Sequence, residues 1–413
     1  MSCAWLRVPC AVASVLSFTD PSPALAAFVN RTARAAAAFA FAGASAFCAA
    51  QLPATSARIT VAPEVPNPSL ASPGSPQRPV PEKPIPVPPA KPEPKDGADI
   101  ALVLPLQSPD YARAAEAVRD GFLAAAEAAG ETRRVRVIGH ADGNVLGGFE
   151  GAKSTGARVV VGPLVRDDLR ALAASSAPLP LTLALNQLDD GVAMPPQVYT
   201  LALAVESDAR VLARRMRGDN VQNVFVIGGN APLMRRFANA FAAEWLLAGG
   251  GPPRGFAFDP TAEGLGVLRR ELGKAAGDGA LIALDGRAAA LARSFVPRMP
   301  AYASSLVNEP LESAALRDLE GVTFVDLPWI ITPDHPSLAK LPRRPRPNLV
   351  LERLYALGLD AFAIARGFTD GVPQRLQIAG ATGQLTLAEG RHFVREGTLA
   401  TFRQGQVVPA DAR

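Results

Sequence analysis

The side chains that could carry catalysis are few in this chain and lie far apart in the sequence. The three histidines, His140, His335 and His392, include no pair at the spacing of metal ligands. Each is interpreted as a surface histidine or as one whose nitrogens are satisfied inside the fold. The residues suggest no serine–histidine–aspartate set. We therefore expect no metal site and no cofactor.

Two pairs of adjacent acids are the remaining candidates for acid–base chemistry. Asp189 and Asp190 precede Gly191, a pattern typical of a turn. Asp167 and Asp168 stand at the expected start of a helix, where carboxylates favour the helix dipole. Neither pair is placed across a substrate as a general acid and base would be. The sequence thus predicts no catalytic residues and a protein that is not an enzyme.

All three cysteines, Cys3, Cys10 and Cys48, precede the first segment with the pattern of a folded domain. The folded part therefore has no thiol chemistry, no disulfide and no cysteine metal site. Residues 30–34 include two arginines, and residues 35–50 are almost wholly small and apolar. This succession is typical of a secretory signal, and the apolar run is too short for a transmembrane helix.

Cys48 stands where a lipoprotein signal carries its lipidated cysteine. Phe47 departs from that pattern, because a small residue is usual directly before the cysteine. Two interpretations remain open: residues 1–48 are a lipoprotein export region lipidated at Cys48, or they are an ordinary signal in which Cys48 is incidental. The true start is expected near Val29.

Residues 49–97 are dense in proline. Such a chain cannot build helix or sheet, and it extends as polyproline II. At about 3.1 Å per residue, some 45 residues would reach on the order of 100 Å. We predict a disordered linker that carries a domain away from a membrane anchor.

The charge of the chain is nearly balanced. It has 42 basic and 38 acidic residues, for a formal net charge of +4. This balance gives no support for nucleic-acid binding, which usually needs a basic stripe with interleaved aromatics. One local cluster, Arg343, Arg344 and Arg346, lies among prolines and is interpreted as an exposed loop rather than a polyanion site.

The folded region opens with a strand followed by a helix. Residues 100–106 form a continuous apolar run that suits a strand buried on both faces. Ser108 can cap the following helix with Pro109 at its first position, and apolar residues then recur at helical spacing. No glycine-rich phosphate loop follows the strand, which argues against a nucleotide site.

The pattern of strand and helix then repeats along the chain. Further strands are predicted at residues 134–138, 158–162, 179–185, 198–203, 223–228, 255–258, 280–284 and 321–326. Helices are predicted between them, including one capped by Ser207 and a long one over residues 349–368, and the tail over residues 377–396 is predicted to be β.

Two α/β series of domain size, meeting near residues 204–208, predict a two-lobed fold of the type I periplasmic-binding-protein class. The domain is expected over residues 98–405. Its first lobe is assigned to about residues 98–204 plus returning segments from about 319–405, and its second lobe to about 205–318.

Particular segments resemble the penicillin-binding-protein activator family. They are residues 100–123, 160–164, 183–186, 353–362 and Gly380-Ala-Thr-Gly-Gln-Leu385, followed by Arg395-Glu396. Members of that family are outer-membrane lipoproteins that stimulate bifunctional peptidoglycan synthases. The resemblance thus implies a lipid-anchored protein on the periplasmic side of the outer membrane, with a class A penicillin-binding protein as its partner. Long members carry a helical-repeat domain where this chain has its proline-rich stretch.

Type I folds bind ligands between their lobes, at strand ends and helix N-termini. The candidates for such a cleft are Ser108, Tyr111, Gly162 and Asn186. In amino-acid receptors of this fold, small hydroxyl residues hold the ligand carboxylate, and here Asn186 follows Leu185 where a Ser/Thr pair is expected. The alternative is a vestigial cleft in which Ser108 is only a helix cap.

Three functions therefore remain open at this point. The first is a lipid-anchored activator of a peptidoglycan synthase that acts by protein contact across the periplasm. The second is a solute receptor of the amino-acid type for an ABC transporter, and the third is a cell-envelope enzyme. The long linker favours the first, because a transport receptor usually needs no such spacer.

Overall fold

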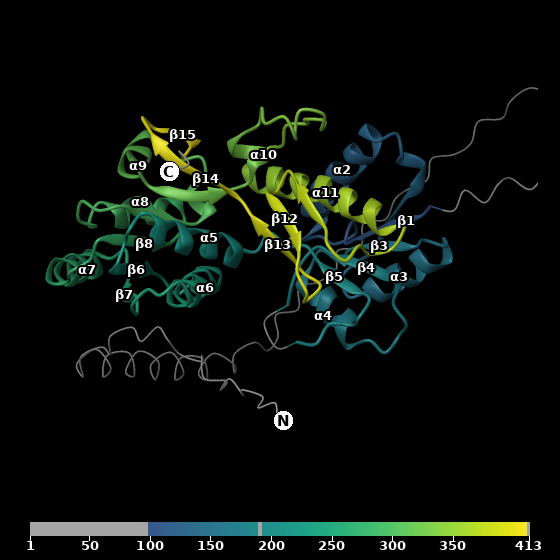
Figure 1. Ribbon diagram of the computed structural model, residues 1–413, viewed down its shortest axis with the longest axis horizontal. Helices are drawn as coiled ribbons and strands as arrows, with labels where there is room; N and C mark the ends of the chain where they lie inside the picture. Colours follow the sequence, from purple (N-terminus) through teal and green to yellow (C-terminus); the bar gives the residue numbers. More distant parts are fainter. Residues whose placement is uncertain (1–97, 189–191, 411–413) are drawn as a thin grey trace, which may run out of the picture. The chain divides into compact units, whose positions relative to one another are not determined.

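The computed structural model describes residues 98–188 and 192–410, and within them two parallel α/β lobes (Figure 1). The first lobe has a five-stranded parallel sheet in the order β2-β1-β3-β4-β5. Its strands are β1 (Ile100–Leu104), β2 (Val135–Gly139), β3 (Val159–Val161), β4 (Leu181–Ala184) and β5 (Val198–Thr200). Its helices are α2 (Ala112–Ala128), η1 (Thr132–Arg134), α3 (Val145–Ser154) and α4 (Arg166–Ala174).

Strand β1 shows why the apolar run at the start of the domain forms the centre of this sheet. All five of its residues are buried. Because side chains alternate along a strand, Leu102 packs into one core with α2 while Val103 packs into a separate core with α3 and α4. A strand covered by helices on both faces needs apolar residues at every position, as the sequence predicted.

The second lobe has a seven-stranded sheet in the order β15-β14-β10-β9-β8-β6-β7. The parallel strands are β6 (Val224–Gly228), β7 (Arg254–Ala257), β8 (Gly279–Ala283), β9 (Ala301–Ala303) and β10 (Thr323–Asp326), and the antiparallel ones are β14 (Thr398–Arg403) and β15 (Gln406–Pro409). Its helical segments are α5 (Val205–Gly218), α6 (Pro232–Leu247), α7 (Ala262–Lys274), α8 (Gly286–Arg293), η2 (Ser305–Val307) and α9 (Ser313–Asp318). Helices α5 and α6 share one core with the sheet, and α7 and α8 share another.

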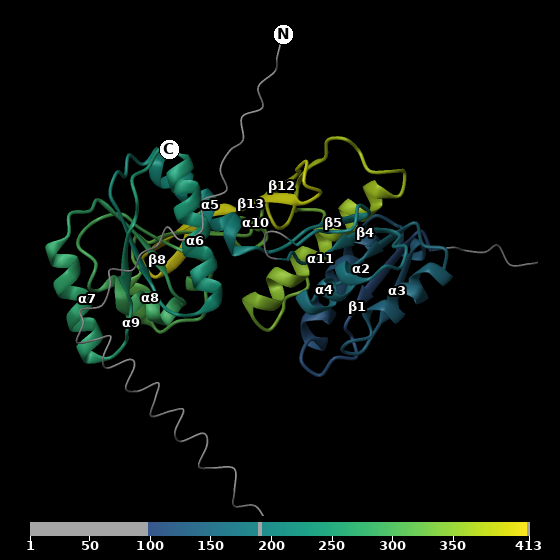
Figure 2. The ribbon, with the colours of Figure 1, turned by 90° about the horizontal axis from the view of Figure 1, so that it is seen from below.

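The long helix α11 (Leu349–Phe368) returns to the first lobe and crosses α2 (Figure 2). Two glycines allow the close approach of these helices. A Cβ atom on Gly121 would lie 2.0 Å from the carbonyl oxygen of Tyr355, and one on Gly358 would lie 2.1 Å from that of Val118. The short helix α10 (Pro328–Ile331) precedes α11.

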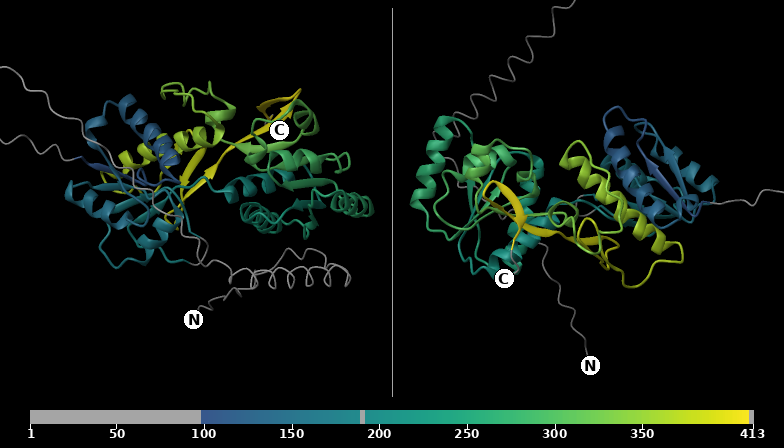
Figure 3. Two further views of the ribbon diagram at one scale, coloured as in Figure 1. Left: turned by 180° about the vertical axis from the view of Figure 1, so that it is seen from behind. Right: turned by 90° about the horizontal axis from the view of Figure 1, so that it is seen from above.

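A third sheet of three antiparallel strands follows α11. It consists of β11 (Gln377–Ala379), β12 (Gln384–Leu387) and β13 (Phe393–Glu396). Leu385 and Phe393 belong to the core of the first lobe, so this small sheet packs with that lobe. From β13 the chain passes through Gly397 directly into β14 of the second sheet (Figure 3).

The chain therefore crosses between the lobes at three places. The crossings are β5 to α5, β10 to α10 and α11, and β13 to β14. The two-lobed type I architecture predicted from the sequence is confirmed.

The boundaries of the lobes differ from the prediction. The prediction assigned returning segments from about residues 319–405 to the first lobe and ended the second lobe at about residue 318, but β10 pairs with β9, and β14 pairs with β10, within the second sheet. The domain also continues beyond residue 405 into β15. The assignment was wrong because a short buried strand such as β10 carries the same apolar pattern whichever sheet it joins.

Two helix starts also differ from the prediction. Helix α5 begins at Val205, so Ser207 lies in its first turn and does not cap it. Helix α2 begins at Ala112, three residues after Pro109.

No helix in the described ranges is both long and apolar enough to span a lipid bilayer.

Candidate functional site

The structure places Ser108 and Tyr111 in the turn between β1 and α2. Ser108 is buried, and its Oγ accepts hydrogen bonds from the backbone N–H groups of Asp110 at 3.3 Å and Tyr111 at 3.1 Å. This oxygen therefore stabilises the turn that leads into α2, as a cap does. Tyr111 is the residue directly before α2 and is 43% exposed.

Gly162 and Asn186 lie at the ends of neighbouring strands. Gly162 has φ +120°, and a Cβ atom there would lie 2.1 Å from the carbonyl oxygen of Val103, so only glycine fits. The side-chain amide of Asn186 donates to the carbonyl of Leu164 at 2.9 Å, and its Oδ1 accepts from the N–H of Gln187 at 2.9 Å. Both ends of this amide are thus engaged with the backbone.

Residues of both lobes line a small cavity of about 210 Å³ near these strand ends. Its lining is Leu164, Arg166, Leu185, Asn186, Gln187, Ala202, Leu203, Ala204, Val205, Leu233, Arg236, Leu354 and Leu357. Of the four predicted cleft residues, Asn186 lines this cavity, whereas Ser108, Tyr111 and Gly162 do not.

The chemistry of this cavity does not suit an α-amino acid. Most of its described lining residues are leucine, alanine or valine, and none is acidic, so no carboxylate of this lining would hold an ammonium group. Arg236 is paired with Glu206, whose Oε1 lies 2.6 Å from the arginine Nε. The geometry is that of a small, mainly apolar pocket in which the side chains of Asn186 and Arg236 are already partnered.

A second set of polar residues is buried where the chain crosses between the lobes. Asp326 is the last residue of β10, and Arg353 lies on α11. Arg353 Nη2 lies 2.7 Å from Asp326 Oδ2, and its Nε lies 3.0 Å from Oδ1, a two-point contact. The carboxylate also accepts hydrogen bonds from Asn308 Nδ2 and the N–H of Leu327, each at 2.8 Å.

Arg395 and Asp208 form another ion pair nearby, between β13 and α5. Their side chains are only 2% and 5% exposed. Burial raises the pKa of Asp208 to about 6, against the opposing charge and hydrogen bond of Arg395. Arg395 also donates to the carbonyl of Thr382 at 3.2 Å.

Asp360, on α11, organises the Gly380-Ala-Thr-Gly383 turn. Its carboxylate accepts hydrogen bonds from the N–H groups of Ala381 and Thr382, each at 2.7 Å, and from Thr382 Oγ1 at 2.5 Å. A Cβ atom on Gly380 would lie 2.5 Å from Asp360 Oδ2, so the turn wraps closely around the acid. Burial raises the pKa of Asp360 to about 6, although these hydrogen bonds favour its charged form.

We call the set Asp208, Asp326, Arg353, Asp360 and Arg395 the polar junction. The sequence segments that suggested a family supply Arg353, Asp360, the glycine turn and Arg395. Arg353 and Arg395 of these segments pair with acids of the second lobe, whereas Asp360 organises the glycine turn within the first lobe. Sequence reasoning missed Asp208 and Asp326 as members, and the only available signal was an acid next to buried apolar runs.

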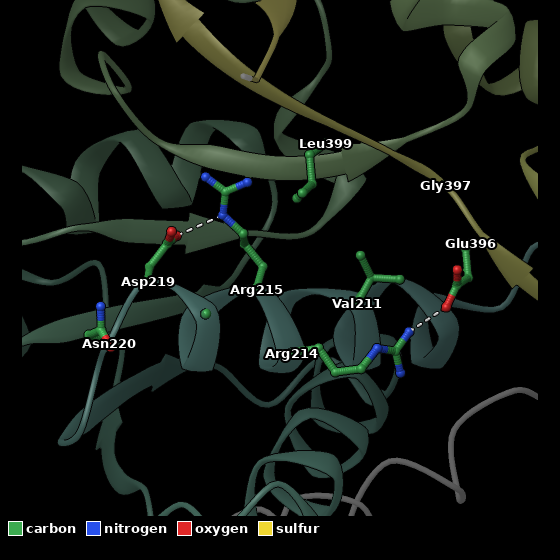
Figure 4. Close-up of a pocket in the computed structure, with 9 residues that line it drawn as sticks. Val211, Arg214, Arg215, Asp219, Asn220, Glu396, Gly397 and Leu399 are labelled. Atoms are coloured by element: carbon green, nitrogen blue, oxygen red, sulfur yellow. Dashed lines mark hydrogen bonds and ion pairs between the residues drawn. The ribbon is translucent and has the colours of Figure 1, made fainter. Parts of the chain in front are cut away.

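A groove of about 560 Å³ lies beside the junction, along α5 and the passage from β13 to β14 (Figure 4). Val211 and Leu399 contribute apolar surface to it. Arg214 reaches Glu396 at 2.8 Å, and Arg215 lies 2.8 Å from Asp219 (Figure 4). Both arginines of the groove therefore face carboxylates.

In the proline-rich loop before α11, Arg343 and Arg344 are exposed as predicted, but the side chain of Arg346 is only 16% exposed, and each of the three has an internal contact. Arg343 stacks on the ring of Trp329 at 3.8 Å, Arg344 lies 2.8 Å from Glu127, and Arg346 lies 2.8 Å from Asp120. These contacts tie the loop to α2 and α10. Each arginine of the cluster therefore has a partner within the chain.

The histidines lie apart in the structure as well. His335 and His392 are exposed. His140 is buried, with Nδ1 2.9 Å from the carbonyl of Ala141 and Nε2 3.9 Å from Asp168 Oδ2. Among the residues that the structure describes, none forms a hydrogen bond with this Nε2. Within residues 98–188 and 192–410, no three His, Cys, Asp or Glu side chains are grouped to hold a metal ion.

Two parallel lobes joined by three crossings place the chain in the structural class of type I periplasmic binding proteins. A family model described as "LppC putative lipoprotein" matches residues 93–252 and 288–405, and the chain belongs to this family.

Curated relatives share the same domain. The chain is 27% identical over 311 residues to the penicillin-binding protein activator LpoA of Edwardsiella piscicida, covering 62% of this chain and 43% of that protein. It is 28% identical over 301 residues to LpoA of Escherichia coli O6:H1, covering 62% of this chain and 44% of that protein. The chain thus spans about half the length of the curated relatives that it matches.

Solved structures agree with both the fold and the family. The C-domain of LpoA from Haemophilus influenzae, described as a regulator of PBP1A, matches with a TM-score of 0.66 and 25% identity over 76% of this chain and 99% of that domain. A protein of Chromobacterium violaceum ATCC 12472, described as a "putative branched-chain amino acid ABC transporter", matches with a TM-score of 0.64 and 35% identity, covering 73% and 99% of the two chains.

Proposed function

We propose that this protein is a non-catalytic lipoprotein of the outer membrane that activates a class A penicillin-binding protein by direct contact across the periplasm. The observation that carries the proposal is the match of the whole two-lobed domain to the LpoA C-domain described as a regulator of PBP1A. An activator of this kind must bind the active state of its partner more tightly than the inactive state.

The organisation of the chain supports the same function. Cys48 would carry the lipid, and residues 49–97 would act as a spacer that brings the domain to the synthase. Both lie outside the described residues. A spacer long enough to cross much of the periplasm is useful to a protein that acts on a distant partner.

The experiment is glycan-strand cross-linking by a purified class A synthase from the same cell, with and without this protein. A saturable rise in cross-linking with a matching binding isotherm supports the proposal. Undetectable binding to every such synthase of the cell would contradict it.

A solute receptor is the second candidate, and its observation is the match to the Chromobacterium violaceum protein. The cavity between the lobes argues against it, because no acidic residue of its described lining could hold an amino group. Calorimetry with the 20 amino acids decides between the two: micromolar binding of any of them would favour the receptor.

The anchor is tested separately by Cys48→Ala. Without a lipidated cysteine, the protein should move from the outer-membrane fraction to the soluble periplasmic fraction, as judged by fractionation and immunoblotting. Retention of the Cys48→Ala protein in the outer membrane would show that Cys48 is not the anchor.

A further inference from the structure

The members of the polar junction lie at the places where the chain crosses between the lobes. Each of the three chain crossings contributes a member close to the crossing itself. Asp208 is in the first turn of α5, Asp326 ends β10, and Arg395 is the penultimate residue of β13.

Both buried ion pairs join one lobe to the other. Arg395 and Arg353 come from β13 and α11, which pack with the first lobe. Their partners, Asp208 and Asp326, come from α5 and β10, which belong to the second lobe. The segments that a hinge would have to bend are therefore linked by charges held out of water.

The two ion pairs allow little relative movement of the residues that they join. Asp326 is held by two nitrogens of Arg353, by Asn308 and by the N–H of Leu327. Arg353 also donates to the carbonyls of Ser305 and Asn308, at 3.1 and 3.3 Å. Moving either partner by a few ångströms would leave a buried charge without its counter-charge, which is strongly unfavourable.

We propose that the Asp208–Arg395 and Asp326–Arg353 pairs form a clasp that holds the two lobes in one arrangement and suppresses the hinge closure used by solute receptors. The protein then presents a single rigid two-lobed surface. This inference does not depend on the proposed function, because it concerns the motion of this chain alone.

The test measures the distance between the lobes in the full chain. The three cysteines lie outside the described domain, so Cys3→Ser, Cys10→Ser and Cys48→Ser give a background for labelling. Glu116→Cys on α2 and Arg269→Cys on α7 are exposed and carry nitroxide labels. Pulsed electron spin resonance should give one narrow distance distribution.

Opening the clasp should broaden that distribution. Asp208→Asn leaves Arg395 buried without a counter-charge, and Asp326→Asn does the same to Arg353, so each variant should widen the distribution at least twofold. Glu396→Gln is the matched control. It removes an ion pair between the same two elements, β13 and α5, but Glu396 and Arg214 are 54% and 44% exposed, and the width should not change.

The labelled protein with an unaltered junction supplies a measurement that does not depend on whether the junction variants fold. With the junction intact, adding the 20 amino acids must not shift the distance between the labels. The proposal is overturned by a shift on addition of amino acids, by a broad distribution in the unaltered junction, or by folded Asp208→Asn and Asp326→Asn proteins whose distributions stay narrow.

Discussion

At the strand ends of the first lobe, where the sequence predicted a cleft, the polar side chains bond to backbone groups of the same lobe. Ser108 accepts from N–H groups two and three residues away, and Asn186 bonds to Leu164 and Gln187. At the polar junction, by contrast, Asp208 and Arg395 are 187 positions apart in sequence and come from different lobes. The buried charges of this chain thus join its lobes, and few polar side chains face the cavity between them.

The strongest way to test that contrast is to remove one charge from the junction. Arg353→Ala leaves the fully buried Asp326 carboxylate without its main partner. Breaking a buried pair in this way costs about 3–5 kcal/mol of the free energy of unfolding. Chemical denaturation monitored by circular dichroism measures the change.

Arg214→Ala provides the comparison for that variant. Its pairs with Glu244 and Glu396 are partly exposed, and exposed pairs contribute about 0–1 kcal/mol. Equal losses in the Arg353→Ala and Arg214→Ala proteins would mean that the junction is no more important than a surface ion pair.

The pH dependence of stability tests the acids of the junction next. The pKa of Asp360 is raised to about 6 in the folded chain, so the folded state holds this proton more tightly than the unfolded state does. Its contribution to the free energy of unfolding is therefore fully present below about pH 4 and is lost as the pH rises to about 6, by about 3 kcal/mol in total.

Asp360→Asn removes this titration and supplies the measurement. The difference in unfolding free energy between the original protein and the variant should change in the variant's favour as the pH rises from 4 to 6, and should then level off. A flat difference for Asp360→Asn would contradict the raised pKa of its carboxyl.

The sequence predicted where the strands and helices of the first lobe occur along the chain, because apolar runs and helical spacing are local patterns. It could not predict which sheet β10 and β14 join, since pairing between distant strands leaves no local trace. The same limit applies to the site. Ser108 was predicted as a cleft residue or as a helix cap. Its Oγ accepts hydrogen bonds within the turn before α2, whose N-cap position is Tyr111, whereas Asp208 pairs with a residue 187 positions away.

The crossing of α2 and α11 tests whether close packing, as well as charge, holds the motif segment over residues 353–362. Gly358→Ala places a Cβ atom 2.1 Å from the carbonyl oxygen of Val118, so the two helices must move apart. Overpacking of this kind costs about 1–3 kcal/mol. Thermal unfolding should show a lower midpoint for the variant.

Gly367→Ala on the same helix is its control. A Cβ atom there meets nothing within 4 Å, so the better helix propensity of alanine should raise stability by about 0.5–1 kcal/mol. Opposite signs for the two substitutions support the packing role of Gly358, and a neutral Gly358→Ala would contradict it.

The smallest effect is expected for the predicted cleft residues, and it distinguishes a structural role of these residues from a role in binding. Asn186→Ala removes hydrogen bonds to the carbonyl of Leu164 and the N–H of Gln187, and its cost should be about 1 kcal/mol. Because that amide serves the backbone, stimulation of the synthase at saturating protein should stay within about twofold of the original. Tyr111→Ala, at an exposed position, should change neither stability nor stimulation. A tenfold loss of stimulation in a folded Asn186→Ala protein would contradict this expectation. Asn186 would then contribute to activation of the synthase as well as to the local backbone structure.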